Sequence, residues 1–86
     1  IIQMTRYFAV HLAEHRIRVN AVSPGGIRNP DSPQGSGFQS EYGFRCPLER
    51  MAETNEIVEP ILFLLAPASS YVNGHNIVAD GAMSCW

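Results

Sequence analysis

The sequence predicts an α/β fold built on an open parallel sheet. Apolar residues recur at helical spacing in two segments, and a short β-branched run follows each of them. The predicted order is therefore helix, strand, long loop, helix, strand. A crossover connection that contains a helix joins strands that run parallel, which gives an open α/β sheet.

The composition of the 86 residues is that of one small globular unit, with 45% hydrophobic and 16% charged residues. The net charge of −2 and the lack of a basic run exclude a typical nucleic-acid partner. The longest apolar run, residues 61–66, is far too short to span a membrane. Because Ile1 already stands in a helical pattern without a capping residue before it, we expect the chain to be a segment of a larger protein.

The first predicted helix covers about residues 1–14. Its apolar stripe, predicted to pack in a core or between subunits, consists of Ile1, Met4, Phe8 and Leu12. His11 and His15 have a spacing that can bind a metal, but without an adjacent catalytic Glu we interpret them as solvated. Cys46 and Cys85 lack metal-binding or redox spacing, and we expect free thiols in a reducing cytoplasm.

The first predicted strand, residues 17–22, is short, β-branched and bounded by a Pro-Gly turn. Residues 24–53 then form a predicted long loop, because four prolines and five glycines interrupt every period. Loops of this length are usually functional or disordered, and the aromatic residues Phe38, Tyr42 and Phe44 argue against disorder. We expect a lid over an apolar ligand, with room for short helices.

The second predicted helix covers residues 55–66, with Thr54 as its N-cap. It is apolar nearly all round, which predicts burial, and Pro60 predicts a kink or a late start. Asn73-Gly74 is a turn signal, and residues 76–79 form the last predicted strand.

The stretch Ser23-Pro24-Gly25-Gly26 lies at the carboxyl end of the first predicted strand. Open α/β sheets bind their ligands beyond the carboxyl ends of strands. Glycines without a Cβ let a flat ligand approach the backbone. An ordinary tight turn explains the same residues, and the pattern alone leaves both interpretations open.

Several short motifs in a fixed order resemble the C-terminal third of the short-chain dehydrogenase/reductase family. They are RVN leading to Pro24-Gly25, the stretch PLERM at 47–51, the stretch ASSYVNG at 68–74, and the closing Asp80-Gly81. The resemblance covers nearly the whole chain. It implies the C-terminal part of a Rossmann-like, doubly wound parallel sheet.

The resemblance implies a NAD- or NADP-dependent oxidoreductase that transfers a hydride between nicotinamide and a small-molecule alcohol or carbonyl. The family's catalytic Ser, Tyr and Lys and its Gly-rich turn match no position here, so we assign no catalytic residue and expect this segment alone to be inactive. The cofactor-binding residues that carry over are Pro24, Gly25, Gly26, Ile27 and Asn29, where Asn29 replaces the family's usual Thr. Phe38, Tyr42 and Phe44 lie in the family's variable substrate loop and are the candidates for substrate contact.

Family members commonly form tetramers or dimers, so the resemblance also implies a homo-oligomer with contacts along residues 1–14 and the last helix and strand. Asn20 and Asp80-Gly81 are interpreted as structural. Two alternatives remain: a non-catalytic scaffold or oligomerisation module of the same fold, and a member that has lost its activity. Neither NAD against NADP nor the identity of the substrate follows from these residues.

Overall fold

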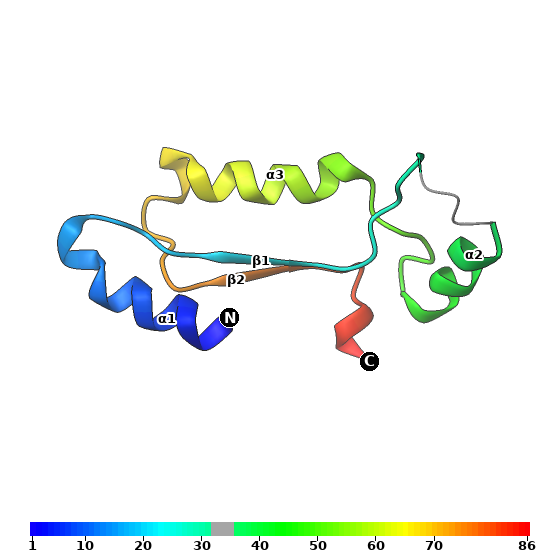
Figure 1. Cartoon of the computed structure of the whole chain (residues 1–86), viewed down its shortest axis with the longest axis horizontal. Coiled ribbons are helices and arrows are strands. Elements are labelled where there is room, and N and C mark those ends of the chain that lie inside the picture. Colours follow the sequence, from blue (N-terminus) through cyan, green and yellow to red (C-terminus); the bar gives the residue numbers. More distant parts are fainter. Residues whose placement is uncertain (32–35) are drawn as a thin grey trace. The chain divides into compact units, whose positions relative to one another are not determined.

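The computed structural model describes residues 1–31 and 36–86, and the side chains of residues 1–31 and 41–86. Figure 1 shows its helices and strands in chain order. They are α1 (Ile2–His11), β1 (Ala21–Pro24), α2 (Ser36–Arg45), α3 (Thr54–Leu65) and β2 (Asn76–Ala79). Short 3₁₀ turns lie at Ala13–His15, Pro67–Ser69 and Met83–Cys85.

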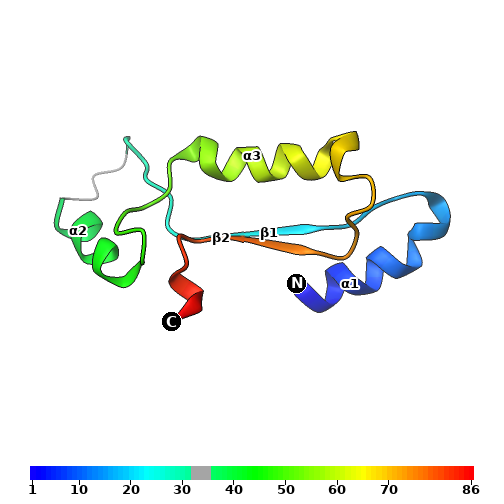
Figure 2. The same cartoon turned by 180° about the vertical axis from the view of Figure 1, so that it is seen from behind.

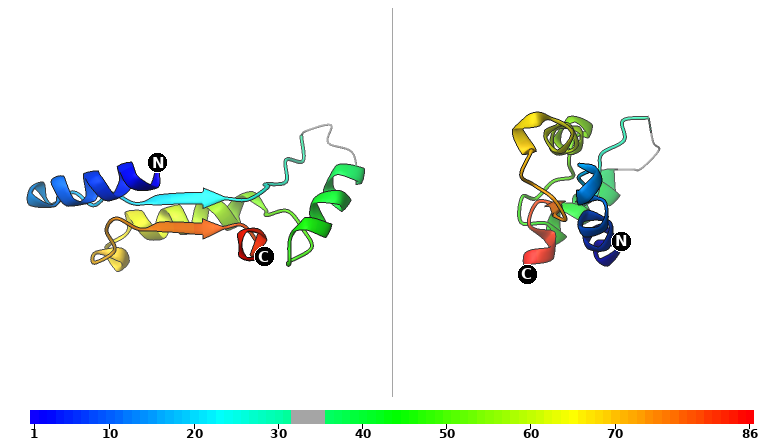
Figure 3. Two further views of the ribbon diagram at one scale, coloured as in Figure 1. Left: turned by 90° about the horizontal axis from the view of Figure 1, so that it is seen from below. Right: turned by 90° about the vertical axis from the view of Figure 1, so that its left-hand side faces the viewer.

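The two strands form a parallel sheet, as predicted. The N–H of Ala21 donates to the carbonyl of His75 at 2.9 Å, and the N–H of Gly25 donates to the carbonyl of Ala79 at 3.0 Å. Donor and acceptor advance together along both strands, which is the register of a parallel pair. The strands lie side by side and point the same way in Figures 2 and 3.

The chain divides into two compact units, which are described separately below. The first unit contains residues 1–23 and 59–77, and the second contains residues 24–58 and 78–86.

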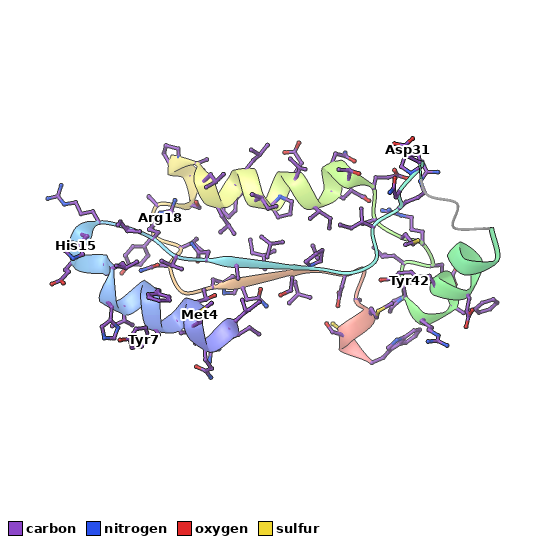
Figure 4. The ribbon with its side chains drawn as sticks, viewed as in Figure 1. Met4, Tyr7, His15, Arg18, Asp31 and Tyr42 are labelled. Carbon is purple, nitrogen blue, oxygen red and sulfur yellow. The ribbon has the colours of Figure 1, made fainter. Side chains whose placement is uncertain are left out.

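In the first unit, α1 buries a different face from the predicted stripe. Thr5 and Ala9 are buried, whereas Ile1, Met4 (labelled in Figure 4) and Phe8 are 89%, 56% and 41% exposed. The small side chain of Ala9 allows a close approach of the 73–74 turn, since a Cβ at Gly74 would lie 3.3 Å from the Cβ of Ala9. The side-chain amide of Asn73, in that turn, donates to the carbonyl of Ala9 at 3.0 Å.

The first strand begins at Ala21 instead of Ile17, because side chains bind the backbone before it. Asn73 accepts the N–H of Val19 through its side-chain oxygen at 2.9 Å. Asn20 accepts the N–H of His75 at 2.9 Å and donates from its side chain to the carbonyl of Val72 at 2.9 Å. These bonds replace a strand ladder and give Asn20 the structural role predicted for it.

In the second unit, the predicted loop of residues 24–53 contains the ten-residue helix α2. The side chains of Cys46, Met51 and Ile57 form the small apolar core of this unit. α3 runs unbroken through Pro60, so the predicted late start does not occur. Thr54 is its first helical residue rather than its cap.

The prediction that the apolar second helix is buried is wrong for this chain. Among the described residues of α3 only Ile57 is buried. The exposed apolar side chains of the helix are Val58, Ile61, Leu62, Phe63 and Leu65. Small units bury a low fraction of their surface, and the described residues offer too few partners to cover these side chains. No helix among the described residues is long and apolar enough to cross a membrane.

Candidate functional site

The turn that follows β1 is held on both sides by main-chain hydrogen bonds within the second unit. Gly25 donates its N–H to Ala79, and the carbonyl of Gly26 accepts the N–H of Ala52 at 2.9 Å. The N–H of Arg28 donates to the carbonyl of Ala52 at 2.8 Å. Ile27 and Ala52 thus form a parallel bridge, and main-chain hydrogen bonds hold residues 25–28 in place.

The bridge leaves the main-chain groups of Ile27 available. In a parallel pair, the residue between two bonded neighbours points its own N–H and C=O away from the partner strand. Gly26 and Arg28 make the two bonds to Ala52, and neither main-chain group of Ile27 has a hydrogen-bond partner among the described residues. Ile27 therefore presents one donor and one acceptor side by side.

Tyr42, on α2, lies directly against the glycine turn (Figure 4). Its hydroxyl accepts a hydrogen bond from the N–H of Gly26 and donates to the Sδ of Met83 at 3.7 Å. A Cβ at Gly26 would lie 2.5 Å from the Cζ of Tyr42. The turn needs a glycine here because an aromatic ring of this chain packs on it.

Gly25 is equally confined, but by backbone. A Cβ added at Gly25 would lie 2.9 Å from the Cα of Asp80 and 3.0 Å from the hydroxyl of Tyr42. Residues of the chain itself therefore pack closely on this turn, and the approach of a flat ligand to these glycines stays a prediction.

A pocket of about 160 Å³ opens beside this turn in the second unit. Its lining residues are Gly25, Gly26, Tyr42, Leu48, Arg50, Ala52, Glu56, Ile57, Ala79, Asp80 and Gly81. The pocket combines apolar walls with three charged residues, Arg50, Glu56 and Asp80, a composition common in small-molecule sites.

Arg50 and Glu56 pair beside this pocket through two hydrogen bonds of 2.7 and 2.8 Å. Glu56 also accepts the N–H of Glu53 at 2.8 Å, which caps the start of α3. The hydrogen bond from Arg50, followed by that from the Glu53 N–H, lowers the pKa of Glu56 to about 2. Because Glu56 and Arg50 satisfy each other, this pair stabilises the pocket wall and its carboxylate remains ionised at neutral pH.

The residues Asp80-Gly81 shape the other wall and have the structural role predicted for them. The carboxylate of Asp80 accepts the N–H groups of Ala82 and Ser84, both at 2.9 Å. The hydrogen bond from the side chain of Ser84 is the largest cause that lowers the pKa of Asp80. Gly81 has a φ of +62°, and a Cβ there would lie 2.5 Å from the Sγ of Cys46.

Asn29 lies in the exposed segment after the bridge. Its side-chain oxygen accepts the N–H of Asp31 at 3.0 Å, which closes an Asx turn. Its amide nitrogen has no hydrogen-bond partner among the described residues and remains a possible donor to a ligand.

Two of the three predicted substrate residues, Tyr42 and Phe44, do not share one location. Tyr42 lines the pocket beside Gly26, whereas Phe44 is 85% exposed and lines a separate cavity of about 450 Å³ with Trp86. Residues two apart on a helix point in nearly opposite directions, and α2 is a helix. Phe38 lies in α2, but its side chain is outside the described residues.

Sequence reasoning did not assign Leu48, Arg50, Ala52 and Glu56 to the site. One local signal was available: Glu56 stands at the third position of a helix start, where an acidic side chain binds back to the cap. The pairing of Ala52 with Ile27 had no local signal, since it joins segments 25 residues apart. Among the described residues, no group of three or more His, Cys, Asp or Glu side chains is arranged to hold a metal ion.

Comparison with protein families matches residues 1–84 to a family described as enoyl-(acyl carrier protein) reductase. A D-arabinitol 2-dehydrogenase of Candida albicans is 40% identical over 100% of this chain and 32% of its own length. A tropinone reductase homologue of Arabidopsis thaliana is 38% identical over 95% of this chain and 32% of its own length. The chain thus spans about a third of the length of these curated relatives.

Solved structures contain the same arrangement of elements. A short chain dehydrogenase family protein of Francisella tularensis superposes with a TM-score of 0.88 at 30% identity, over 99% of this chain and 40% of that one. A short chain dehydrogenase of Leptospira borgpetersenii, solved with bound NAD+, gives a TM-score of 0.86 at 39% identity. That match covers 98% of this chain and 32% of the other.

Proposed function

This chain belongs to the short-chain dehydrogenase/reductase family of oxidoreductases, and from this membership we propose that it forms the C-terminal part of a NAD- or NADP-dependent enzyme. In that enzyme the chain supplies the wall beside the nicotinamide, the substrate lid and contacts between subunits. The proposed substrate is a small-molecule alcohol or carbonyl compound. The proposed cofactor-binding residues of this chain are Pro24, Gly25, Gly26, Ile27 and Asn29.

The free main-chain pair of Ile27 carries this proposal. A nicotinamide carboxamide has one carbonyl acceptor and one NH₂ donor, and Ile27 presents a donor beside an acceptor. The two groups are complementary in the same way as two paired strand residues. The side-chain amide of Asn29, two residues further along the chain, offers a further donor. The donor set of this segment therefore fits a nicotinamide cofactor.

The cofactor, when bound, supplies the ring that gives or accepts the hydride. This chain would hold the carboxamide through Ile27 and thereby fix which face of the ring meets the substrate. Leu48, Ala52 and Ile57 give the neighbouring pocket its apolar walls. Tyr42 is the substrate-loop residue at this pocket, while Phe44 and Phe38 are proposed to contact substrate from the remainder of α2.

Titration calorimetry of the full-length protein that carries this chain tests the proposal. We expect binding of NAD+ or NADP+, with weaker binding of ADP-ribose or its 2′-phosphate, which lack the nicotinamide. Hydride transfer is then measured through the absorbance of reduced nicotinamide with a panel of alcohols and carbonyl compounds. The panel follows the names of the relatives described above and includes D-arabinitol and tropinone. A protein that binds neither cofactor contradicts the proposal.

A second candidate function, a non-catalytic scaffold or oligomerisation module, is supported by exposed apolar side chains. Ile1, Met4, Tyr7 and Val10 of the first unit all lie on the surface of this chain. Such side chains are typical of contacts between copies. Sedimentation gives the oligomeric state, and calorimetry gives cofactor binding. A tetramer or dimer that binds cofactor is the proposed enzyme, and an oligomer that does not bind cofactor is a scaffold. A monomer contradicts the oligomer proposal.

We also propose a cytoplasmic location. Cys46 and Cys85 are free thiols, and free thiols persist in reducing compartments. Cell fractionation that finds the protein in a secreted or organelle fraction contradicts this location.

A further inference from the structure

We propose that Tyr42 is a positioning residue for the nicotinamide cofactor, which it affects through the Gly26–Ile27 backbone. The inference rests on the proposed function, because it assigns the residue that holds the cofactor-facing segment in place. It differs from the role expected from the sequence, in which Tyr42 contacts substrate.

The hydrogen bonds of the turn explain why a side chain is needed there. The N–H of Gly25 donates to the carbonyl of Ala79. The carbonyl of Gly26 accepts the N–H of Ala52, and the carbonyl of Ala52 accepts the N–H of Arg28. The N–H of Gly26 has no main-chain partner among the described residues. The hydroxyl of Tyr42 accepts it.

This hydrogen bond acts on the Gly25–Gly26 peptide, which is joined to the Gly26–Ile27 peptide at the Cα of Gly26. Gly26 lacks a side chain, so packing alone holds its peptide plane weakly. The ring of Tyr42 covers Gly26 on one side, and its hydroxyl fixes the direction of the Gly26 N–H. The next peptide, Gly26–Ile27, is held by the bond from the Ala52 N–H to the Gly26 carbonyl. With the peptides on both sides of its Cα held, Gly26 cannot rotate, and Tyr42 together with Ala52 maintains the direction in which Ile27 presents its donor and acceptor.

The second partner of the hydroxyl supports an anchoring role. Tyr42 donates to the Sδ of Met83, which lies in the turn that follows Asp80-Gly81. Its ring therefore spans from α2 to the glycine turn, and its hydroxyl is half-buried between two partners. A hydroxyl engaged in this way is better suited to hold protein backbone than to recognise a substrate.

The test uses Tyr42→Phe in the full-length protein, since this variant keeps the ring and removes only the hydroxyl. Tyr71→Phe is the matched control, because Tyr71 is fully exposed and has no side-chain hydrogen bond among the described residues. The affinities of NAD+ and ADP-ribose are measured by calorimetry, or those of NADP+ and 2′-phospho-ADP-ribose if the wild type prefers NADP+. The second ligand of each pair lacks the carboxamide.

We expect Tyr42→Phe to weaken the nicotinamide cofactor about 3- to 10-fold, the effect of one hydrogen bond, and to leave the ADP-ribose compound unchanged. Tyr71→Phe should change neither affinity. A general loss of structure would weaken both ligands equally, and that result overturns the inference. Unchanged cofactor affinity overturns it too, and tighter binding would show instead that Tyr42 competes with the cofactor. In these three cases wild-type binding still supports the proposed function, whereas a wild type that binds neither cofactor overturns both.

Discussion

Arg50 and Glu56 face each other through two hydrogen bonds, of 2.7 and 2.8 Å, at the rim of the pocket. This fork-to-fork geometry is the strongest arrangement available to an arginine and a carboxylate. Because Glu56 also caps the start of α3 through the Glu53 N–H, the pair connects the helix start to the preceding segment.

Glu56→Gln is expected to lower stability at neutral pH, with an effect that disappears in acid. The pKa of Glu56 in the folded protein is about 2, below its ordinary value of 4.5. A depressed folded pKa contributes stability above the unfolded pKa, and this contribution is lost as the pH falls from about 4.5 through about 2. Denaturant unfolding of the full-length protein at pH 7 and at successively lower pH measures the difference between the variant and the wild type.

Glu59→Gln is the matched control for this change. Glu59 lies one turn further along α3 and has no ion pair among the described residues. Both groups are exposed, so the Glu56 effect should shrink in high salt. A difference between Glu56→Gln and the wild type that stays constant down to pH 2 contradicts the assigned pKa.

The order of elements was predictable because periodicity and turn residues are local. The first strand was placed four residues too early since Val19 and Asn20 have strand-like neighbours in sequence. The N–H of Val19 donates to the side chain of Asn73, and the side chain of Asn20 binds the backbone of Val72 and His75, all more than 50 positions away. Such side-chain bonds leave no periodic signal in the sequence.

Arg18 is expected to be a major source of stability in the first unit. Its guanidinium donates to the carbonyls of Leu64 at 2.8 Å and Val72 at 3.0 Å, and so binds the last carbonyls of α3 and the following turn (Figure 4). A lysine cannot reproduce this planar fork. Arg18→Lys should destabilise the full-length protein by about 1–3 kcal/mol in denaturant unfolding.

Arg16→Lys controls for the change of residue type, since Arg16 is exposed and its side chain has no hydrogen bond among the described residues. Equal stability of the Arg18→Lys and Arg16→Lys variants would show that the fork contributes nothing measurable.

The site was predictable only in part. The position of Pro24-Gly25-Gly26 after a strand pointed to the ligand end of the sheet, and the structure places a pocket there. The separation of Tyr42 from Phe44 was not foreseen, because glycines around them hide a helical period and suggested an extended lid. Ala52 was missed because its bridge to Ile27 is non-local.

Gly26→Ala is expected to destabilise the protein through the ring of Tyr42. The new Cβ would lie 2.5 Å from Cζ and 2.6 Å from Cε2 of that ring. Gly26 is not among the glycines with positive φ, so the cost is steric rather than conformational. Overpacking of this kind costs about 1–3 kcal/mol in thermal unfolding of the full-length protein.

The double variant Gly26→Ala, Tyr42→Ala provides the control. Without the ring, the added methyl has space, so the cost of Gly26→Ala should fall by at least about 0.5 kcal/mol in that background. Strictly additive effects would refute the contact. Gly25 is unsuited to this test, because its Cβ would meet the backbone of Asp80 at 2.9 Å whatever Tyr42 does.

Asn29→Ala is expected to weaken the nicotinamide cofactor about 2- to 10-fold, which corresponds to one neutral hydrogen bond of about 0.5–1.5 kcal/mol. The free amide nitrogen of Asn29 is the donor that this substitution removes. Asn29→Thr is the matched control, because its hydroxyl both donates and accepts and should retain wild-type affinity. Titration calorimetry of the full-length protein measures all three, and an Asn29→Ala variant that binds like the wild type removes Asn29 from the cofactor site.

The chain expressed alone is expected to lack a cooperative fold and hydride-transfer activity. Its described residues bury only four apolar side chains, those of Ala9, Cys46, Met51 and Ile57. Helix α3 meanwhile exposes five large apolar side chains, and a unit of this size gains little from burial. We therefore expect a broad thermal transition, binding of an apolar dye and association at micromolar concentration. The full-length protein under the same conditions is the reference, and a sharp transition in a monomeric 86-residue chain would show that these exposed faces need no further partner.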